Sequence, residues 1–173
     1  MSTSPTFTIK QIDYSNLGGG LGRMLDRFRD EGTLTGDPTD DAYLASTPAA
    51  ALLGLLYDQR VRAEYAFTGP RRLHERLGHL DLRTIAAMPF DDLQAEFEKQ
   101  PAVHRFTNRM CEYTRQVAAA VSADYAGTAE AIWNDGADFE TIKKRILALP
   151  GFGPQKAGKM KFVLHYLGYR DFS

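Results

Sequence analysis

The sequence predicts an all-α protein, and three observations lead to this fold class. Apolar residues recur every three or four positions in several stretches, as on the buried face of a helix. No run of β-branched residues is long enough to build a sheet, and only Phe7, Ile9 and Ile12 suggest a short extended piece. Proline, glycine and short polar residues stand at the ends of the periodic stretches, which is typical of helices joined by short connections.

The expected elements follow in order. Gly18 to Gly22 is expected to be a flexible loop before a helix over 23–30, because a phosphate-binding loop needs a preceding strand and a Gly-Lys-Ser/Thr ending. Ser46-Thr47-Pro48 predicts the start of an Ala- and Leu-rich helix that runs to about Phe67 and is broken by Gly69-Pro70. The remaining predicted helices are 71–77 closed by Gly78, 82–87 capped by Asp81, 89 to about 100, 103–125 ended by Gly127, 128–133, 139–149, and one that Pro154 opens.

Length and composition place the chain among ordinary globular proteins. Its 173 residues are 43% apolar and 25% charged, which excludes a disordered, collagen-like or disulfide-scaffold protein and fits one domain. No apolar run approaches about 20 residues, and residues 1–8 lack the features of a secretion signal. We therefore expect a soluble, cytoplasmic protein that does not enter a membrane.

Metal chemistry has little support in the sequence. The single cysteine, Cys111, cannot alone hold an iron–sulfur cluster or a tetrahedral zinc ion, and it has no partner for an internal disulfide. The four histidines lack metal-ligand spacing; they are His74, His79, His104 and His165. We expect no required cofactor.

The net charge of −1 conceals an asymmetry. From Thr141 to the end, seven Lys or Arg residues stand against one acid, Asp171, so that this segment carries +6 and the first 140 residues carry −7. Such segregation suggests that the C-terminal segment faces a polyanion. The alternative is a basic helix face exposed only to water.

One segment combines a turn with cations. Between two predicted helices stands Leu149-Pro150-Gly151-Phe152-Gly153-Pro154-Gln155-Lys156-Ala157-Gly158. Gly151 and Gly153 would give the turn backbone freedom, and the helix opened by Pro154 would present backbone N–H groups at one point, where a phosphate can bind. Lys156 and Lys159 lie within its first turn and a half, while Ala157, Met160, Leu164 and Leu167 would pack its other face. A tight corner between helices with incidental glycines explains the turn but not the lysines.

This segment resembles the hairpin of the helix-hairpin-helix (HhH-GPD) DNA glycosylase superfamily, which includes endonuclease III and the alkyladenine glycosylases. The resemblance extends over about 45–168, since residues 52–59 look like the family's first long helix, which ends in a turn containing a Gln. It implies a bilobal helical glycosylase fold with an interlobe cleft. Within one domain, residues 1–173, it implies an N-terminal segment (1–45), a helical lobe (46–140), the helix-hairpin-helix (141–168) and a tail (169–173).

The resemblance also implies roles for particular residues. It assigns DNA binding to Gln59, Gly151, Phe152, Gly153, Gln155, Lys156 and Lys159. Gln59 would fill the gap left by a nucleotide flipped out of the stack. Backbone carbonyls of Leu147, Leu149 and Phe152 would bind a structural Na+ or K+. The implied partner is double-stranded DNA, bound by a monomer associated with the nucleoid.

The expected reaction is hydrolysis of the N-glycosidic bond of a damaged or mismatched base. Bifunctional members of the superfamily carry a nucleophilic Lys two residues after the second hairpin glycine, and here that residue is Gln155, so no lyase activity is expected. The reaction needs a carboxylate in the cleft, and Asp171 is the only acid after the hairpin. Asp58 and Glu64 are its rivals, and each has the alternative of being an ordinary surface acid.

Other assignments stay open at this point. Tyr57, Tyr65, Phe67 and Trp133 are candidates to stack on a flipped base or to fill the core. Arg60 and Arg62 would face the second DNA strand or water. Two further functions compete with catalysis, namely an inactive glycosylase-fold protein that senses lesions and a protein-interaction domain that does not touch DNA.

Overall fold

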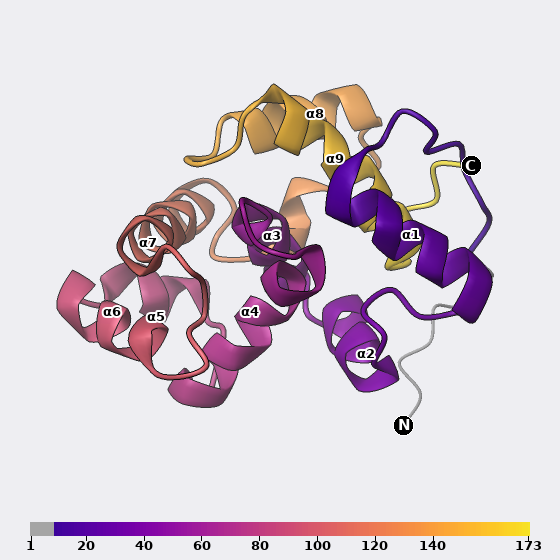
Figure 1. The fold of residues 1–173 in the computed structure, drawn as a ribbon. Helices are drawn as coiled ribbons and strands as arrows, with labels where there is room; N and C mark the ends of the chain where they lie inside the picture. The colour runs from indigo at the N-terminus through magenta and orange to yellow at the C-terminus, as the bar shows by residue number, and fades with distance from the viewer. Residues whose placement is uncertain (1–8) are drawn as a thin grey trace.

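The computed structural model describes residues 9–173, and this part of the chain is all helical, as predicted (Figure 1). Residues 9–173 contain no strand, so Ile9 and Ile12 form no extended element, while Phe7 lies outside the described residues. The helices are α1 (Gly19–Glu31), α2 (Pro38–Ser46), α3 (Pro48–Tyr57), α4 (Ala63–Leu77), α5 (Leu82–Ala87), α6 (Phe90–Glu98), α7 (Thr107–Asp124), the 3₁₀ helix η1 (Ala129–Ile132), α8 (Phe139–Leu147) and α9 (Pro154–Tyr166).

Helix α3 is the centre of the core. Every residue from Ala50 to Tyr57 is buried, and the helix packs against α2, α4, α9 and η1. A helix that is apolar on all sides is stable only when neighbours surround it, which the Ala- and Leu-rich sequence anticipates. Around α3 and α4, helices α5 to α7 lie at one end of the molecule and α1 and α2 at the other (Figure 1).

The long helix expected to run to Phe67 is in fact two helices. α3 ends at Tyr57, and α4 begins at Ala63 after a five-residue turn in which Arg60 has a left-handed φ of 57°. The predicted break at Gly69-Pro70 is wrong, because both residues lie within α4 and are buried. A Cβ at Gly69 would approach the Tyr57 ring within 2.9 Å, so this glycine allows α4 to pack closely on α3.

The glycine-rich segment near the N-terminus was expected to be a loop, but α1 begins within it at Gly19. Packing explains the difference. A Cβ at Gly20 would lie 2.6 Å from the Ala63 Cβ, and one at Gly22 would lie 2.7 Å from the Leu17 carbonyl oxygen. The small residues therefore let the start of α1 contact the start of α4.

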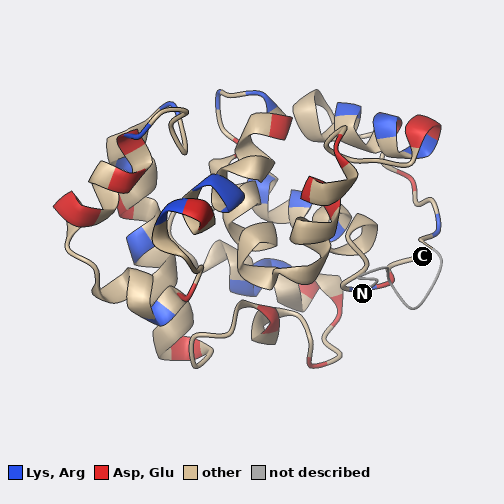
Figure 2. Ribbon diagram, turned by 90° about the horizontal axis from the view of Figure 1, so that it is seen from below, with Lys and Arg blue, Asp and Glu red and all other residues tan. Residues whose placement is uncertain are grey.

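Several smaller differences concern boundaries. Helix α2 was not predicted, although its signals are present: the Asp37 side chain accepts from the Thr39 N–H, and Pro38 is the first helical residue. Helix α7 begins at Thr107 rather than Val103, α8 ends at Leu147 rather than Leu149, and 129–132 is 3₁₀. Figure 2 shows basic and acidic residues on neighbouring parts of the helices, in keeping with the net charge of −1.

Candidate nucleic-acid interface

The turn between α8 and α9 is packed against the core on one side and is open to solvent on the other. Leu149 and Phe152 are buried, so the turn is fixed to the core by two apolar side chains. Gly151 has a left-handed φ of 85°, and a Cβ there would lie 2.7 Å from Leu56 Cδ1. Gly153 differs, because its φ is −93° and a Cβ there would meet no atom within 4 Å. The fold thus requires glycine at 151 but not at 153.

An open hollow of about 640 Å³ joins this turn to the end of α3. Packing of α9 on α3 brings together residues about 90 positions apart in sequence. The lining residues are Asp58, Gln59, Gly151, Gly153, Pro154, Gln155, Lys156 and Lys159. Six of the seven residues predicted to bind DNA therefore meet in one place, while Phe152 lies buried beneath them.

Lys156 connects the two sides of the hollow. Its Nζ donates to the Leu56 carbonyl oxygen at 2.9 Å and to Gln59 Oε1 at 3.4 Å. Burial lowers the pKa of this lysine, and the nearby Asp58 carboxylate opposes that shift. The ammonium therefore already stabilises the C-terminal end of α3, where helix carbonyls lack internal donors.

His104 gives the same end of α3 a second donor. The Phe106 N–H donates to His104 Nδ1 at 2.9 Å, so Nε2 carries the proton of the neutral ring and donates to the Tyr57 carbonyl oxygen at 2.9 Å. The side chain is fully buried, and burial lowers its pKa. Spacing alone gave no signal for this role, because the partner carbonyl is 47 residues away.

Asp58 follows directly after the stabilised end of α3 and is half-buried. Burial raises the pKa of its carboxyl, while the charges of Lys159, Lys156 and Arg23 act in the opposite direction. Among the described residues that line the hollow, Asp58 is the only acid.

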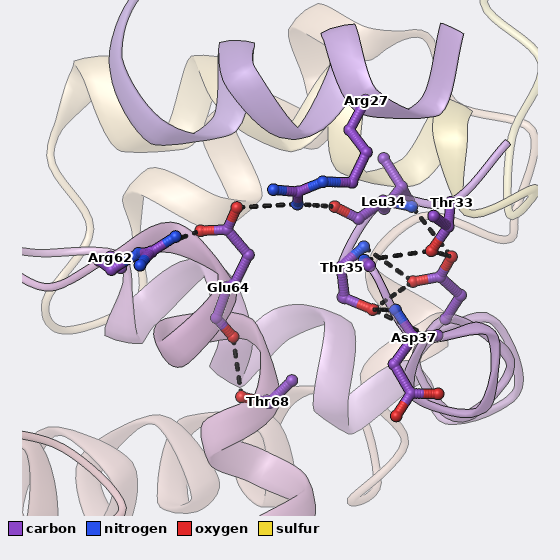
Figure 3. Close-up of polar contacts among 10 residues, drawn as sticks. Arg27, Thr33, Leu34, Thr35, Asp37, Arg62, Glu64 and Thr68 are labelled. Atoms are coloured by element: carbon purple, nitrogen blue, oxygen red, sulfur yellow. Dashed lines mark hydrogen bonds and ion pairs between the residues drawn. The ribbon is translucent and has the colours of Figure 1, made fainter. Parts of the chain in front are cut away.

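Glu64 faces another way. One carboxylate oxygen accepts from Arg27 Nη1 of α1 at 2.8 Å, and the other lies 4.0 Å from Arg62 Nε (Figure 3). Burial would raise its pKa, but its own backbone N–H and the Arg27 guanidinium hold the pKa below its ordinary value. Glu64 thus joins α4 to α1 and does not line the hollow.

Asp171 lies at the far end of α9 from the hairpin. Its Oδ1 accepts from the Ser173 N–H at 2.9 Å and lies 3.9 Å from His165 Nδ1, in the last turn of α9. Thirteen residues of helix, about 20 Å at 1.5 Å per residue, separate the two ends of α9. The chain end marked C in Figure 1 lies on that side, so the structure does not bring Asp171 together with the hairpin residues.

Three of the four aromatic candidates belong to the core, and Tyr65 is only half-buried. Tyr57, Phe67 and Trp133 are buried, and the Tyr57 hydroxyl is bonded to Thr114 Oγ1 at 2.8 Å. The Tyr65 ring lies beneath the guanidinium of Arg72, 3.7 Å from its centroid. None of these four lines the hollow.

The turn after Gln59 carries two exposed cations. Arg60 is exposed, and the Arg62 side chain is 80% accessible to solvent. Arg60 has a left-handed backbone conformation and lies between the end of α3 and the start of α4. Both guanidinium groups are therefore carried on the turn that also contributes Asp58 and Gln59 to the hollow.

No known protein family, curated protein or solved structure matches the chain. Within residues 9–173, no three His, Cys, Asp or Glu side chains form a group that would hold a metal ion, and no helix is long and apolar enough to span a membrane.

Proposed function

We propose that this protein binds double-stranded DNA through the α8–α9 turn and removes a damaged or mismatched base by hydrolysis of its N-glycosidic bond. The observation that carries the proposal is the hollow, where the hairpin, two lysines and the Asp58–Gln59 turn meet. An enzyme that acts on a base in duplex DNA must hold the backbone and extrude the base, and the two sides of the hollow supply groups for both tasks.

The hairpin has the chemistry of a phosphate site. Gly153 is the N-cap of α9 and has no side chain to satisfy the N–H groups of the first turn, and the residues of that turn line the hollow together with Lys159. Since the fold leaves open space at the Gly153 Cβ position, close approach of a ligand backbone explains this glycine better than internal packing does.

The rest of the proposed arrangement follows the family that the hairpin resembles. We propose that the fold is the bilobal glycosylase fold and that the hollow is part of its interlobe cleft. Gln59 enters the stack when the base leaves. The carbonyls of Leu147, Leu149 and Phe152 are proposed to bind a Na+ or K+ ion that also contacts a phosphate, because carbonyl oxygens are the donors that such hard cations prefer.

A second candidate function is lesion sensing without catalysis. The observation that favours it is the position of Asp171, which lies outside the hollow. A protein that holds DNA at the hairpin but lacks the carboxylate that acts on the extruded base would bind damage and leave it intact.

Binding is tested by fluorescence anisotropy with a labelled duplex. We expect Gly153→Asp and Lys159→Glu to weaken binding at least tenfold, and binding to weaken as salt rises. Lys99→Glu makes the same charge change at an exposed site that does not line the hollow, where its partner is Glu96, and should bind like the wild type. Equal affinity for all four proteins would refute the proposed interface.

Excision is tested separately. Duplexes carrying uracil, alkylated purines, oxidised purines or mismatches are incubated with the protein, and alkali then cleaves any abasic site. Cleavage supports the glycosylase. Tight binding with no cleavage of any duplex supports the sensor.

A further inference from the structure

We infer that Asp58, rather than Asp171, is the catalytic carboxylate of this site, acting on the water that replaces the base. The inference rests on the proposed function and names the group that the reaction needs. It follows from three features of the structure: the position of Asp58, the way its turn is held, and the charges around it.

Position is the first feature. Asp58 lies at the C-terminal end of α3, where its backbone N–H donates to the Leu55 carbonyl oxygen at 3.1 Å, and it lines the hollow opposite Gly151 and Gly153. Gln59, the next residue, lines the same hollow. If Gln59 enters the stack as the base leaves, the adjacent carboxylate lies beside the sugar of the extruded nucleotide.

Rigidity is the second feature. A catalytic group must be held close to its productive geometry, and the supporting contacts are usually buried hydrogen bonds. The two carbonyls that precede Asp58 each accept from a distant side chain, Leu56 from Lys156 and Tyr57 from His104, both at 2.9 Å. Helix α9 and the segment before α7 thus each fix the end of α3 that carries Asp58.

Charge is the third feature. Lys156 and Lys159 of α9 and Arg23 of α1 favour the ionised carboxylate, and Glu64 of α4 opposes them. Burial raises the pKa of Asp58, so the group is a stronger proton acceptor than a carboxylate in water. By contrast, hydrogen bonds from the Ser173 hydroxyl and N–H hold the pKa of the exposed Asp171 below its ordinary value.

The chemistry balances without a further reactant. The bond between the sugar C1′ and the base nitrogen breaks, and the base keeps the electron pair. The developing positive charge on the sugar is stabilised by the Asp58 carboxylate. The oxygen of one water molecule bonds to C1′, Asp58 accepts the proton that this water loses, and that proton finally transfers to the base nitrogen. One water is consumed, and a free base and an abasic sugar are produced.

The test compares Asp58→Asn with Asp171→Asn on a duplex that the wild type cleaves. We expect Asp58→Asn to lower the single-turnover rate of base release about 10²- to 10⁴-fold while the anisotropy titration stays within threefold of wild type. Asp171→Asn, which alters an exposed acid outside the hollow, should release the base at the wild-type rate. Circular dichroism and urea unfolding show whether either variant is folded.

A second variant guards against a folding artefact. Formate added to Asp58→Ala should restore part of the base release, because it supplies a carboxylate to the vacated space. Wild-type rates in Asp58→Asn, or loss of release in Asp171→Asn only, would overturn the inference and leave the glycosylase proposal intact. A wild type that binds DNA and releases no base would overturn the inference and the glycosylase proposal together.

Discussion

The ammonium of Lys156 donates to the main-chain carbonyl of Leu56 at 2.9 Å, across 100 residues of sequence. This bond joins the first turn of α9 to the last turn of α3. Because this bond connects the hairpin with the Asp58–Gln59 turn, we expect a substitution on either side to change the stability of the other.

Replacing Lys156 by Met should therefore reduce stability. The Leu56 carbonyl would lose a charged donor in a half-buried place, which typically costs about 1.5–3 kcal/mol. Urea unfolding measures the change. Lys144→Met, at an exposed position of α8, is the matched control and should stay within about 0.5 kcal/mol. Equal stability of the two variants would show that the bond contributes nothing.

The two hairpin glycines should respond differently to alanine. Gly151→Ala places a Cβ 2.7 Å from Leu56 Cδ1 at a residue with φ of 85°, so we expect a loss of about 2–4 kcal/mol. Gly153→Ala meets no atom within 4 Å and should leave stability unchanged or slightly raised, while it weakens DNA binding. Thermal unfolding and anisotropy separate the two effects, and a Gly153→Ala protein that binds normally would contradict the proposed contact.

Acid should weaken the fold through His104. Burial puts the pKa of this histidine below its ordinary 6.5, so the unfolded chain binds a proton more readily than the folded one. Its stabilising contribution is complete above pH 6.5 and is lost as the pH falls through the lower folded pKa. Urea unfolding between about pH 7.5 and 5 tests this, since His104→Gln should remove that part of the pH dependence. His79→Gln, which changes a histidine whose Nδ1 accepts from the exposed Asp81 N–H, should retain that pH dependence.

Cys111 should be unreactive in the folded protein. The residue is fully buried, and burial raises the pKa of its thiol to about 12, which leaves almost no thiolate near pH 8. A disulfide reagent should label it slowly in buffer and within minutes in urea. Rapid labelling of the native protein would contradict the buried position.

The hairpin was predictable from sequence because its signals are local. Pro154 opens α9 where expected, and Ala157, Met160 and Leu164 are buried on one face of that helix. Local rules failed where distant contacts decide. Gly20 and Gly69 suggested breaks, yet each lies within a helix because Ala63 or Tyr57 needs the space of a missing side chain.

The choice of carboxylate also depended on contacts between residues that are distant in the sequence. Order along the chain singled out Asp171, which follows the hairpin, but α9 runs away from the turn and carries its C-terminal end to the far side. Asp58 precedes the hairpin by more than 90 residues and reaches it only because α3 and α9 pack together. The hydrogen bonds from Lys156 and His104 to the end of α3 could not be predicted either, because every residue has a backbone carbonyl and the sequence does not show which one accepts.

His165 ties both ends of the described chain to one imidazole ring. The Lys10 carbonyl oxygen is bonded to its Nε2 at 2.6 Å, and the Phe172 N–H donates to its Nδ1 at 3.0 Å. A pulling force applied between residues 10 and 172 would therefore load this ring, together with the Tyr166 hydroxyl that accepts from the Ile12 N–H at 3.1 Å. In a tethered experiment, the proposed DNA binding at the hairpin should therefore persist under a tension that has already freed both terminal segments.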